Sequence, residues 1–126
     1  MNDSTNDTPT AQLVGAQSKV LVTDARGRVI AVHKLNLLDY YRLNHAMGES
    51  ANNPALMNMA VVAAAVHRID TTDLAFPRTE RDVEFILQML DFDGLKAAGE
   101  GLIQLNPHAD DGTEAAKNLA GSQPSN

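Results

Sequence analysis

The stretch PALMNMAVVAAAVHRID, residues 54–70, restricts the fold of this chain more than any other. Methionine, alanine and valine occupy nearly every side of the helix that it predicts, so almost no polar face remains at helical spacing. A helix that is apolar all round is buried over most of its surface. In a chain of 126 residues, it must be the centre of a small core or a surface that a partner covers.

Length and composition favour one small domain with an aliphatic core. The chain is 44% apolar, which suffices for a single core at this length. With three Phe, two Tyr and no Trp, that core must be built from Leu, Val, Ala and Met. We expect a single globular domain at 17–105, between a disordered tail at 1–16 and a flexible tail at 106–126, both of which are polar.

Charge and cysteine content argue against several classes of protein. The net charge of −6 is unfavourable for binding nucleic acid, and the absence of cysteine excludes disulfides and thiolate metal ligands. The N-terminus lacks the pattern of a signal peptide, and no apolar run approaches the roughly 18 residues that a membrane span needs. We therefore expect a cytoplasmic protein with no nucleic acid and no membrane among its partners.

A β-hairpin is predicted near the N-terminus, in KVLVTDARGRVIAVHKL. Branched apolar residues stand on both sides of DARG, where Gly27 can take a positive φ angle. The predicted strands are Lys19–Thr23 and Arg28–His33. The basic RGR at the tip is typical of a solvated turn, and phosphate contact is the less favoured alternative.

Three or four helices should follow the hairpin. Asn36 is the expected N-cap of the first helix, which Gly48 ends, and Asn53 with Pro54 begins a second helix over 55–68. Thr79 caps a third helix, with Asp82 in a capping box. After DFDG, a weaker fourth helix runs to Leu105. The first helix carries a broad apolar stripe, formed by Leu37, Tyr40, Tyr41, Leu43 and Met47.

These elements predict a mainly α fold of the α+β class, in which an N-terminal β-hairpin packs on a small bundle of three to four helices with disordered termini. The segment IDTTDLAFP is a short turn or a small hairpin between helices.

No pattern in the chain indicates a reaction, so we expect no catalytic residue, metal or cofactor. A glycine-rich phosphate loop is absent from the sequence, and His33, His45, His67 and His108 do not form a metal-binding pair on one helix. We interpret His33 and His45 as solvated and His67 as a cation at a helix C-terminus. DFDG at 91–94 is interpreted as a helix N-cap rather than a calcium loop. A small enzyme or metal protein built on His45, His67 and acidic neighbours is an alternative.

The order of several segments resembles that of the small tail assembly chaperones of long-tailed bacteriophages. These segments are VTDARGRVIAVHKLNLLDYYRL, then MG, then MAVVAAAVHRID, then P-TERDVEFILQMLDFDGL. The resemblance spans roughly residues 19–105, with TDARGR, LD-YRL and HRID as its anchors.

The resemblance implies a non-enzymatic assembly factor in the host cytoplasm. Such a factor binds the long helical tape measure protein, keeps it soluble and helps to recruit tail tube subunits. We also expect self-association. A small oligomeric adaptor or regulatory protein from a mobile element, with a different protein partner, is the alternative.

Partner-binding residues are predicted from the pattern of apolar side chains rather than from the family. Methionine is unbranched and polarisable, so it adapts to differing apolar faces of a client helix. We expect core packing for Ala60, Val61, Ala64 and Val66. The partner-binding prediction falls on Met57, Met59, Phe85 and Met89.

Overall fold

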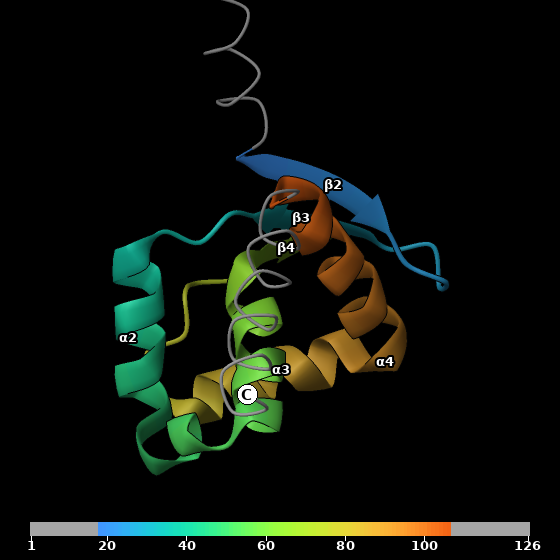
Figure 1. Cartoon of the computed structure of the whole chain (residues 1–126). Coiled ribbons are helices and arrows are strands. Elements are labelled where there is room, and N and C mark those ends of the chain that lie inside the picture. The colour runs from blue at the N-terminus through green and yellow to red at the C-terminus, as the bar shows by residue number, and fades with distance from the viewer. Residues whose placement is uncertain (1–17, 107–126) are drawn as a thin grey trace, which may run out of the picture.

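The computed structural model describes residues 18–106, in which three α-helices and a short 3-10 helix accompany a four-stranded antiparallel sheet (Figure 1). The predicted α+β class is therefore confirmed. The predicted tail at 1–16 lies outside the described residues, as does all of the predicted tail at 106–126 except Asn106. Among residues 18–106, no helix combines the length and the apolar character needed to cross a lipid bilayer.

The predicted hairpin forms one side of the sheet, and two further strands extend it. Strand β2 (Lys19–Thr23) pairs antiparallel with β3 (Val29–His33), with Leu21 opposite Ala31. Strand β3 then pairs with β4 (Val66–Ile69), and β4 pairs with the short β5 (Thr72–Asp73), giving the order β2-β3-β4-β5. The segment after the second helix is thus a small hairpin, one of the two forms expected.

The prediction of a helix over 55–68 is wrong at its C-terminal end. Helix α3 spans Pro54–Ala65, and the chain passes into β4 at Val66, whose φ and ψ of −84° and 122° are extended. The free edge of β3 is available at this point, and its backbone groups pair with β4. Pairing along that edge outweighs the weak helical preference of a β-branched residue. His67 is therefore in a strand and does not cap a helix.

The three predicted helix starts are confirmed by their caps. In α2 (Leu37–Met47), the Asn36 side chain accepts the Asp39 N–H at 2.8 Å and Asp39 accepts the Asn36 N–H at 2.9 Å, closing a capping box. The Asn53 side chain caps α3, and α2 ends at Gly48, where the 3-10 helix η1 (Gly48–Asn52) begins.

The cap of helix α4 (Glu80–Leu105) differs in one detail from the predicted box. Thr79 accepts the Asp82 N–H, as expected, but Asp82 accepts the N–H of Arg78 at 2.9 Å rather than that of Thr79. The Asp82 carboxylate therefore fixes the residue before the cap and still stabilises the helix start.

The apolar stripe predicted for α2 is narrower in the structure. Leu43 and Met47 are buried, whereas Leu37 is 85% exposed and Tyr41 is 68% exposed. Only one edge of α2 faces α3 and η1, because the helix lies at the side of the molecule (Figure 1). The remaining apolar side chains of α2 stay on the surface.

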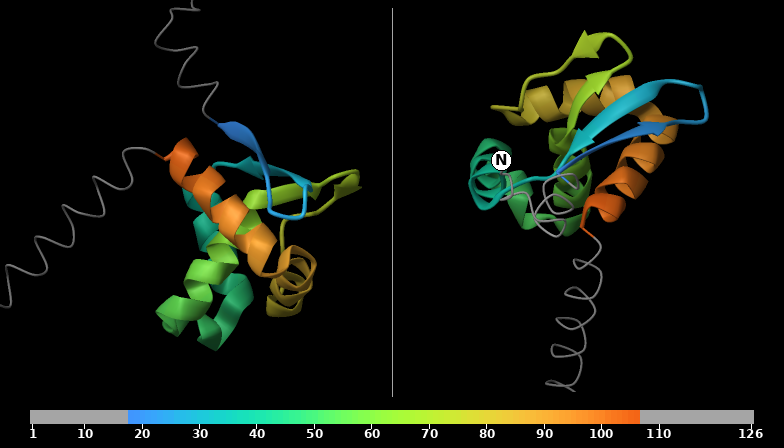
Figure 2. Two further views of the ribbon diagram at one scale, coloured as in Figure 1. Left: turned by 90° about the vertical axis from the view of Figure 1, so that its right-hand side faces the viewer. Right: turned by 90° about the horizontal axis from the view of Figure 1, so that it is seen from above.

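Helix α3 is the centre of the core, and α4 is its main neighbour. The side chains of Ala60 and Ala64 are buried, Val66 is buried, and Val61 is partly buried against the core. Helix α4 bends at Asp91, so that its second half runs beneath the sheet (Figures 1 and 2). The third and fourth helices of the prediction are thus the two halves of α4.

The second half of α4 approaches the sheet closely at a glycine. A Cβ atom added at Gly101 would lie 2.9 Å from Val22 Cγ1, 3.3 Å from Val20 Cγ1 and 3.4 Å from Val32 Cγ2. The glycine that lowers the helical preference here therefore allows β2 and β3 to pack on α4. A Cβ added at Gly99, in the same helix, meets nothing within 4 Å.

Replacing these two glycines with alanine should have opposite effects on stability. Gly99→Ala should raise the free energy of unfolding by up to about 1 kcal/mol, because alanine favours the helix and space is available. Gly101→Ala gains the same preference but pushes α4 away from the valines, at a cost of about 1–3 kcal/mol. Urea unfolding followed by far-UV circular dichroism measures both. Equal stabilisation of the two variants would contradict the close packing at Gly101.

Candidate interaction surface

The tip of the β2–β3 hairpin is held by a buried carboxylate. Asp24 is 6% exposed, and its Oδ1 accepts the backbone N–H groups of Arg26 at 3.0 Å and Arg28 at 2.9 Å. Gly27 takes the expected positive φ of 80° and donates its N–H to the Asp24 carbonyl oxygen. The side chain and carbonyl oxygen of Asp24 thus accept the hydrogen bonds that hold the turn.

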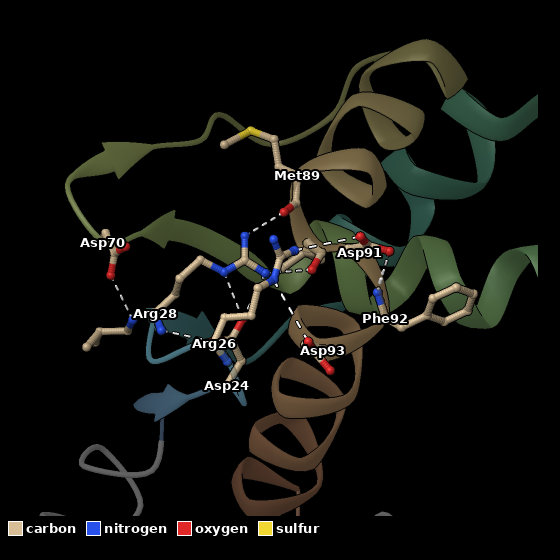
Figure 3. A network of polar contacts seen from close by, with 10 residues as sticks. Asp24, Arg26, Arg28, Asp70, Met89, Asp91, Phe92 and Asp93 are labelled. Carbon is tan, nitrogen blue, oxygen red and sulfur yellow. Dashed lines mark hydrogen bonds and ion pairs between the residues drawn. The ribbon is translucent and has the colours of Figure 1, made fainter.

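Arg28 is not solvated, and the prediction of a solvated basic tip is wrong for this residue. Its Nε and Nη2 lie 2.8 Å from Asp24 Oδ2. Nη1 donates to the Met89 carbonyl oxygen and Nη2 to that of Leu90, both at 2.7 Å (Figure 3). These carbonyls belong to the last turn before the bend in α4, where the regular helical partners are missing. Arg28 therefore caps the first half of α4 from the hairpin.

The same contacts set the charge of Asp24. Burial by itself would raise the pKa of Asp24, but hydrogen bonds from the backbone and side chain of Arg28, together with the guanidinium charge, lower it below its ordinary value. The carboxylate therefore stays ionised at neutral pH. Arg26, by contrast, is half-exposed, and its ion pairs with Asp91 and Asp93 are long, at 3.7 and 3.9 Å.

The bend in α4 is a single residue with left-handed φ. Asp91 has φ 57° and ψ −169°, and its Oδ1 accepts the Phe92 N–H at 2.9 Å. The Asp91 side chain thus accepts the first N–H of the second half of α4, whereas the predicted N-cap would accept the N–H two or three residues further on. The bend also turns Phe92 away from the polar network, and its side chain is 84% exposed (Figure 3).

An apolar groove lies between α3 and the second half of α4. It consists of two adjoining hollows, of about 170 and 850 Å³, that share Leu95. We call it the α3–α4 groove. The smaller hollow is lined by Met59, Leu87, Asp91, Phe92 and Leu95. The larger is lined by Tyr40, Asn58, Val61, Val62, Leu95, Lys96, Gly99, Glu100, Leu102, Ile103 and Asn106.

The four residues predicted to bind a partner lie in different surroundings. Met59 is partly exposed and lines the groove beside Phe92. Phe85 is 58% exposed on the first half of α4 but lines neither hollow. Met57 and Met89 are partly buried against the core. The structure thus brings only Met59 to the groove.

The sequence reasoning missed the residues that form most of this groove. Phe92 was interpreted only as part of the DFDG helix N-cap, and Ile103, which is 55% exposed, only as part of the weaker fourth helix. Two signals in the sequence indicate them. One is an aromatic residue directly after a helix break, and the other is an isoleucine that does not belong to the helical repeat of Leu95, Ala98, Leu102 and Leu105.

Two histidines meet on the face of the sheet opposite α4. The rings of His33 and His67 are 5.4 Å apart in an edge-to-face arrangement. His67 Nδ1 is buried without a hydrogen-bond partner among the described residues. Burial, followed by the nearby His33 and Lys19, lowers the pKa of His67 below its ordinary value, so the ring is neutral in the fold at neutral pH. His45 is exposed on α2, remote from this pair in the fold.

The described residues contain no group of three or more His, Asp or Glu side chains placed to hold a metal ion together. The two larger hollows of this region are lined by a mixture of apolar and polar side chains.

Comparison with models of protein families, with curated proteins and with solved structures gives no match to this chain.

Arg28 and Arg26 form a matched pair for testing the cap on α4. Arg28→Lys cannot reach both carbonyls and Asp24 together, so it should lower the free energy of unfolding by about 2 kcal/mol or more. Arg26→Lys should change it by less than about 0.5 kcal/mol, because its ion pairs are long and exposed. Urea unfolding of both variants gives the comparison. A similar small effect for both would show that the guanidinium is not needed at the bend.

The stability of the fold should also decrease in mild acid through His67. The unfolded chain binds a proton at the ordinary histidine pKa, while the folded chain binds it only at lower pH, so stability is retained above pH ~6.5 and is lost as the pH falls through the folded value. His67→Phe keeps an apolar ring and removes the proton. Urea unfolding at pH 7.5 and pH 5 should show a smaller loss for the variant than for the natural chain; an equal loss would assign the acid sensitivity to other groups.

Proposed function

We propose that this protein is a non-enzymatic tail assembly chaperone of a long-tailed bacteriophage. In the host cytoplasm, it would bind and solubilise the tape measure protein and help to recruit tail tube subunits around it. The resemblance over residues 19–105 is the reason for proposing this family. The α3–α4 groove is a surface with the chemistry that this role requires.

The exposed apolar lining of the groove is the observation that carries the proposal. Phe92 and Ile103 are 84% and 55% exposed, although each is a side chain that proteins usually bury. A helix recognised in a groove places apolar anchors there at spacings of three and four residues. The α4 side of the larger hollow runs from Leu95 to Asn106, which at 1.5 Å per residue is roughly 16 Å, about three turns of a client helix lying along it.

The edge of the groove is polar, which suits a partner that leaves again during assembly. Lys96 and Glu100 stand on α4, and Asn58 stands on α3. Transient interfaces combine an apolar centre with a polar, solvated rim. Met59 adds an adaptable side chain at one end, so successive apolar faces of a repetitive client helix can be accommodated.

Self-association follows from the same surface. When no client is present, the groove residues lose free energy by remaining in water, and a second copy of the chain can cover them. Client binding and self-association would then compete for one site. This competition would keep the chaperone soluble before the tape measure protein is made.

Co-expression with the tape measure protein encoded in the same genome tests the proposal. The client should be insoluble alone and soluble with this chain, and the two should elute together from size-exclusion chromatography with light scattering. If the client gains no solubility and no complex elutes, the chaperone proposal is wrong, and an adaptor with a different partner takes its place.

Surface variants test whether the groove is the binding site. Phe92→Gln combined with Ile103→Gln should weaken the complex at least tenfold, because two apolar anchors are removed. Leu37→Gln is the matched control, since Leu37 is 85% exposed on α2 and lines neither hollow. Both proteins should keep the helical circular dichroism of the natural chain. Equal binding by both variants would show that the binding site lies outside the groove. Phe85→Gln would then test the other exposed aromatic side chain of α4.

A further inference from the structure

A second hollow, separate from the α3–α4 groove, lies between α2 and the segment that joins β5 to α4. It has a volume of about 600 Å³. We call it the α2 pocket; it is lined by Tyr41, Arg42, His45, Ala46, Ala75, Phe76, Pro77 and Arg78. Tyr40 lines the groove and Tyr41 lines the pocket, so the two sites lie on different sides of α2. The joining segment passes beside α2 in Figure 1.

The lining of the α2 pocket is basic in an otherwise acidic protein. Arg42, His45 and Arg78 contribute to it, and no Asp or Glu does, although the whole chain has a net charge of −6. The ion pairs formed within residues 18–106 involve Arg26, Arg28 and Arg68 and leave out Arg42 and Arg78. Two guanidinium groups of the pocket therefore have no carboxylate partner among the described residues.

The acidic side chains that follow the pocket in the sequence are engaged in other contacts. Glu80 Oε2 accepts the hydroxyl hydrogen of Ser50 at 2.7 Å, and Asp82 Oδ2 accepts the backbone N–H of Arg78 at 2.9 Å. The second contact also fixes the backbone of Arg78 at the start of α4. Pro77 is buried and Phe76 is partly buried against the core, so this wall of the pocket is anchored.

We propose that the α2 pocket binds an acidic segment of a partner protein, with Glu or Asp carboxylates between Arg42 and Arg78. Arginine pairs with carboxylates through two parallel hydrogen bonds, and such charge-assisted bonds are stronger than neutral ones. Tyr41 and Phe76 supply apolar surface for the residues next to the carboxylates. The proposal does not depend on the groove or on the identity of its client.

A nucleic acid fits these observations less well than an acidic peptide. Nucleic acids are bound along extended basic surfaces that replace many counterions. Here the basic side chains gather in one pocket, and the rest of the chain carries excess negative charge, which repels a long polyanion. A short acidic segment needs only the pocket.

Fluorescence anisotropy with a labelled peptide tests the proposal on the full chain. The probe is Glu-Glu-Phe-Glu-Asp-Phe, and its neutral counterpart is Gln-Gln-Phe-Gln-Asn-Phe. The acidic peptide should bind, with an affinity that falls as salt is added, and the neutral peptide should bind at least tenfold more weakly. Equal binding of the two peptides would overturn the proposal, because the recognition would then be apolar.

Charge-removing variants locate the site. Arg42→Gln combined with Arg78→Gln should weaken binding of the acidic peptide by about tenfold or more. Arg81→Gln is the matched control: Arg81 is exposed on α4 but does not line the pocket, so binding should change by less than about twofold. Far-UV circular dichroism of both variants should match the natural chain, since all three side chains are on the surface.

Three further results would contradict the proposal. The double variant could bind the peptide as well as the natural chain does, which would place the binding elsewhere. Inorganic phosphate could displace the peptide at equal concentration, which would make the pocket a general anion site. A single-stranded oligonucleotide could bind with the same affinity and the same dependence on Arg42 and Arg78, which would replace a protein partner with a nucleic acid.

Discussion

The guanidinium of Arg28 joins the hairpin to the bend of α4, and the arrangement of the other elements depends on this junction. A helix that ends inside a protein leaves carbonyl groups without partners, and burying them unpaired costs free energy. Arg28 supplies donors to two of these carbonyls while Asp24 balances its charge. The first half of α4 can therefore stop beneath the hairpin, and the second half can start in a new direction.

That change of direction produces both the core and the groove. The second half of α4 reaches the valines of β2 and β3 through Gly101, and its other side runs beside α3. Some apolar side chains of α3 face the core, and others face the groove. Its buried alanines, among them Ala60 and Ala64, allow α4 to pack closely, while Val61 and Val62 line the groove. The helix is thus the centre of the core on one side and a wall of the α3–α4 groove on the other.

Local signals in the sequence predicted the parts of the fold that local chemistry determines. The caps at Asn36, Asn53 and Thr79 and the turn at Gly27 involve residues within four positions of one another, and all were predicted. Strand β4 was missed because its pairing partner, β3, lies more than 30 residues earlier and overrides the local helical pattern. The role of Arg28 was missed for the same reason, since its carbonyl partners are 61 and 62 residues away.

The candidate site was less predictable than the fold. Met57 and Met89 are partly buried and Phe92 is exposed beside the bend at Asp91. The sequence indicated a break at DFDG but not the direction in which the chain leaves it. The α2 pocket likewise joins residues from a helix and a distant connection. Patterns of apolar residues indicate which elements are amphipathic, but they do not show which exposed side chains meet.

The junction between α3 and β4 has a consequence for how the length of this chain can change during evolution. Ile30 pairs with Ile69 and Ala31 with Arg68, but Val32 pairs with Val66, so His67 is the extra residue of a bulge. Without His67, the strand would read Val66, Arg68, Ile69, which alternates buried, exposed and buried as a regular strand does. Elsewhere in β4, loss of one residue would move every later side chain to the opposite face of the sheet. His67 is therefore the position in this strand at which a homologue one residue shorter could keep the same core.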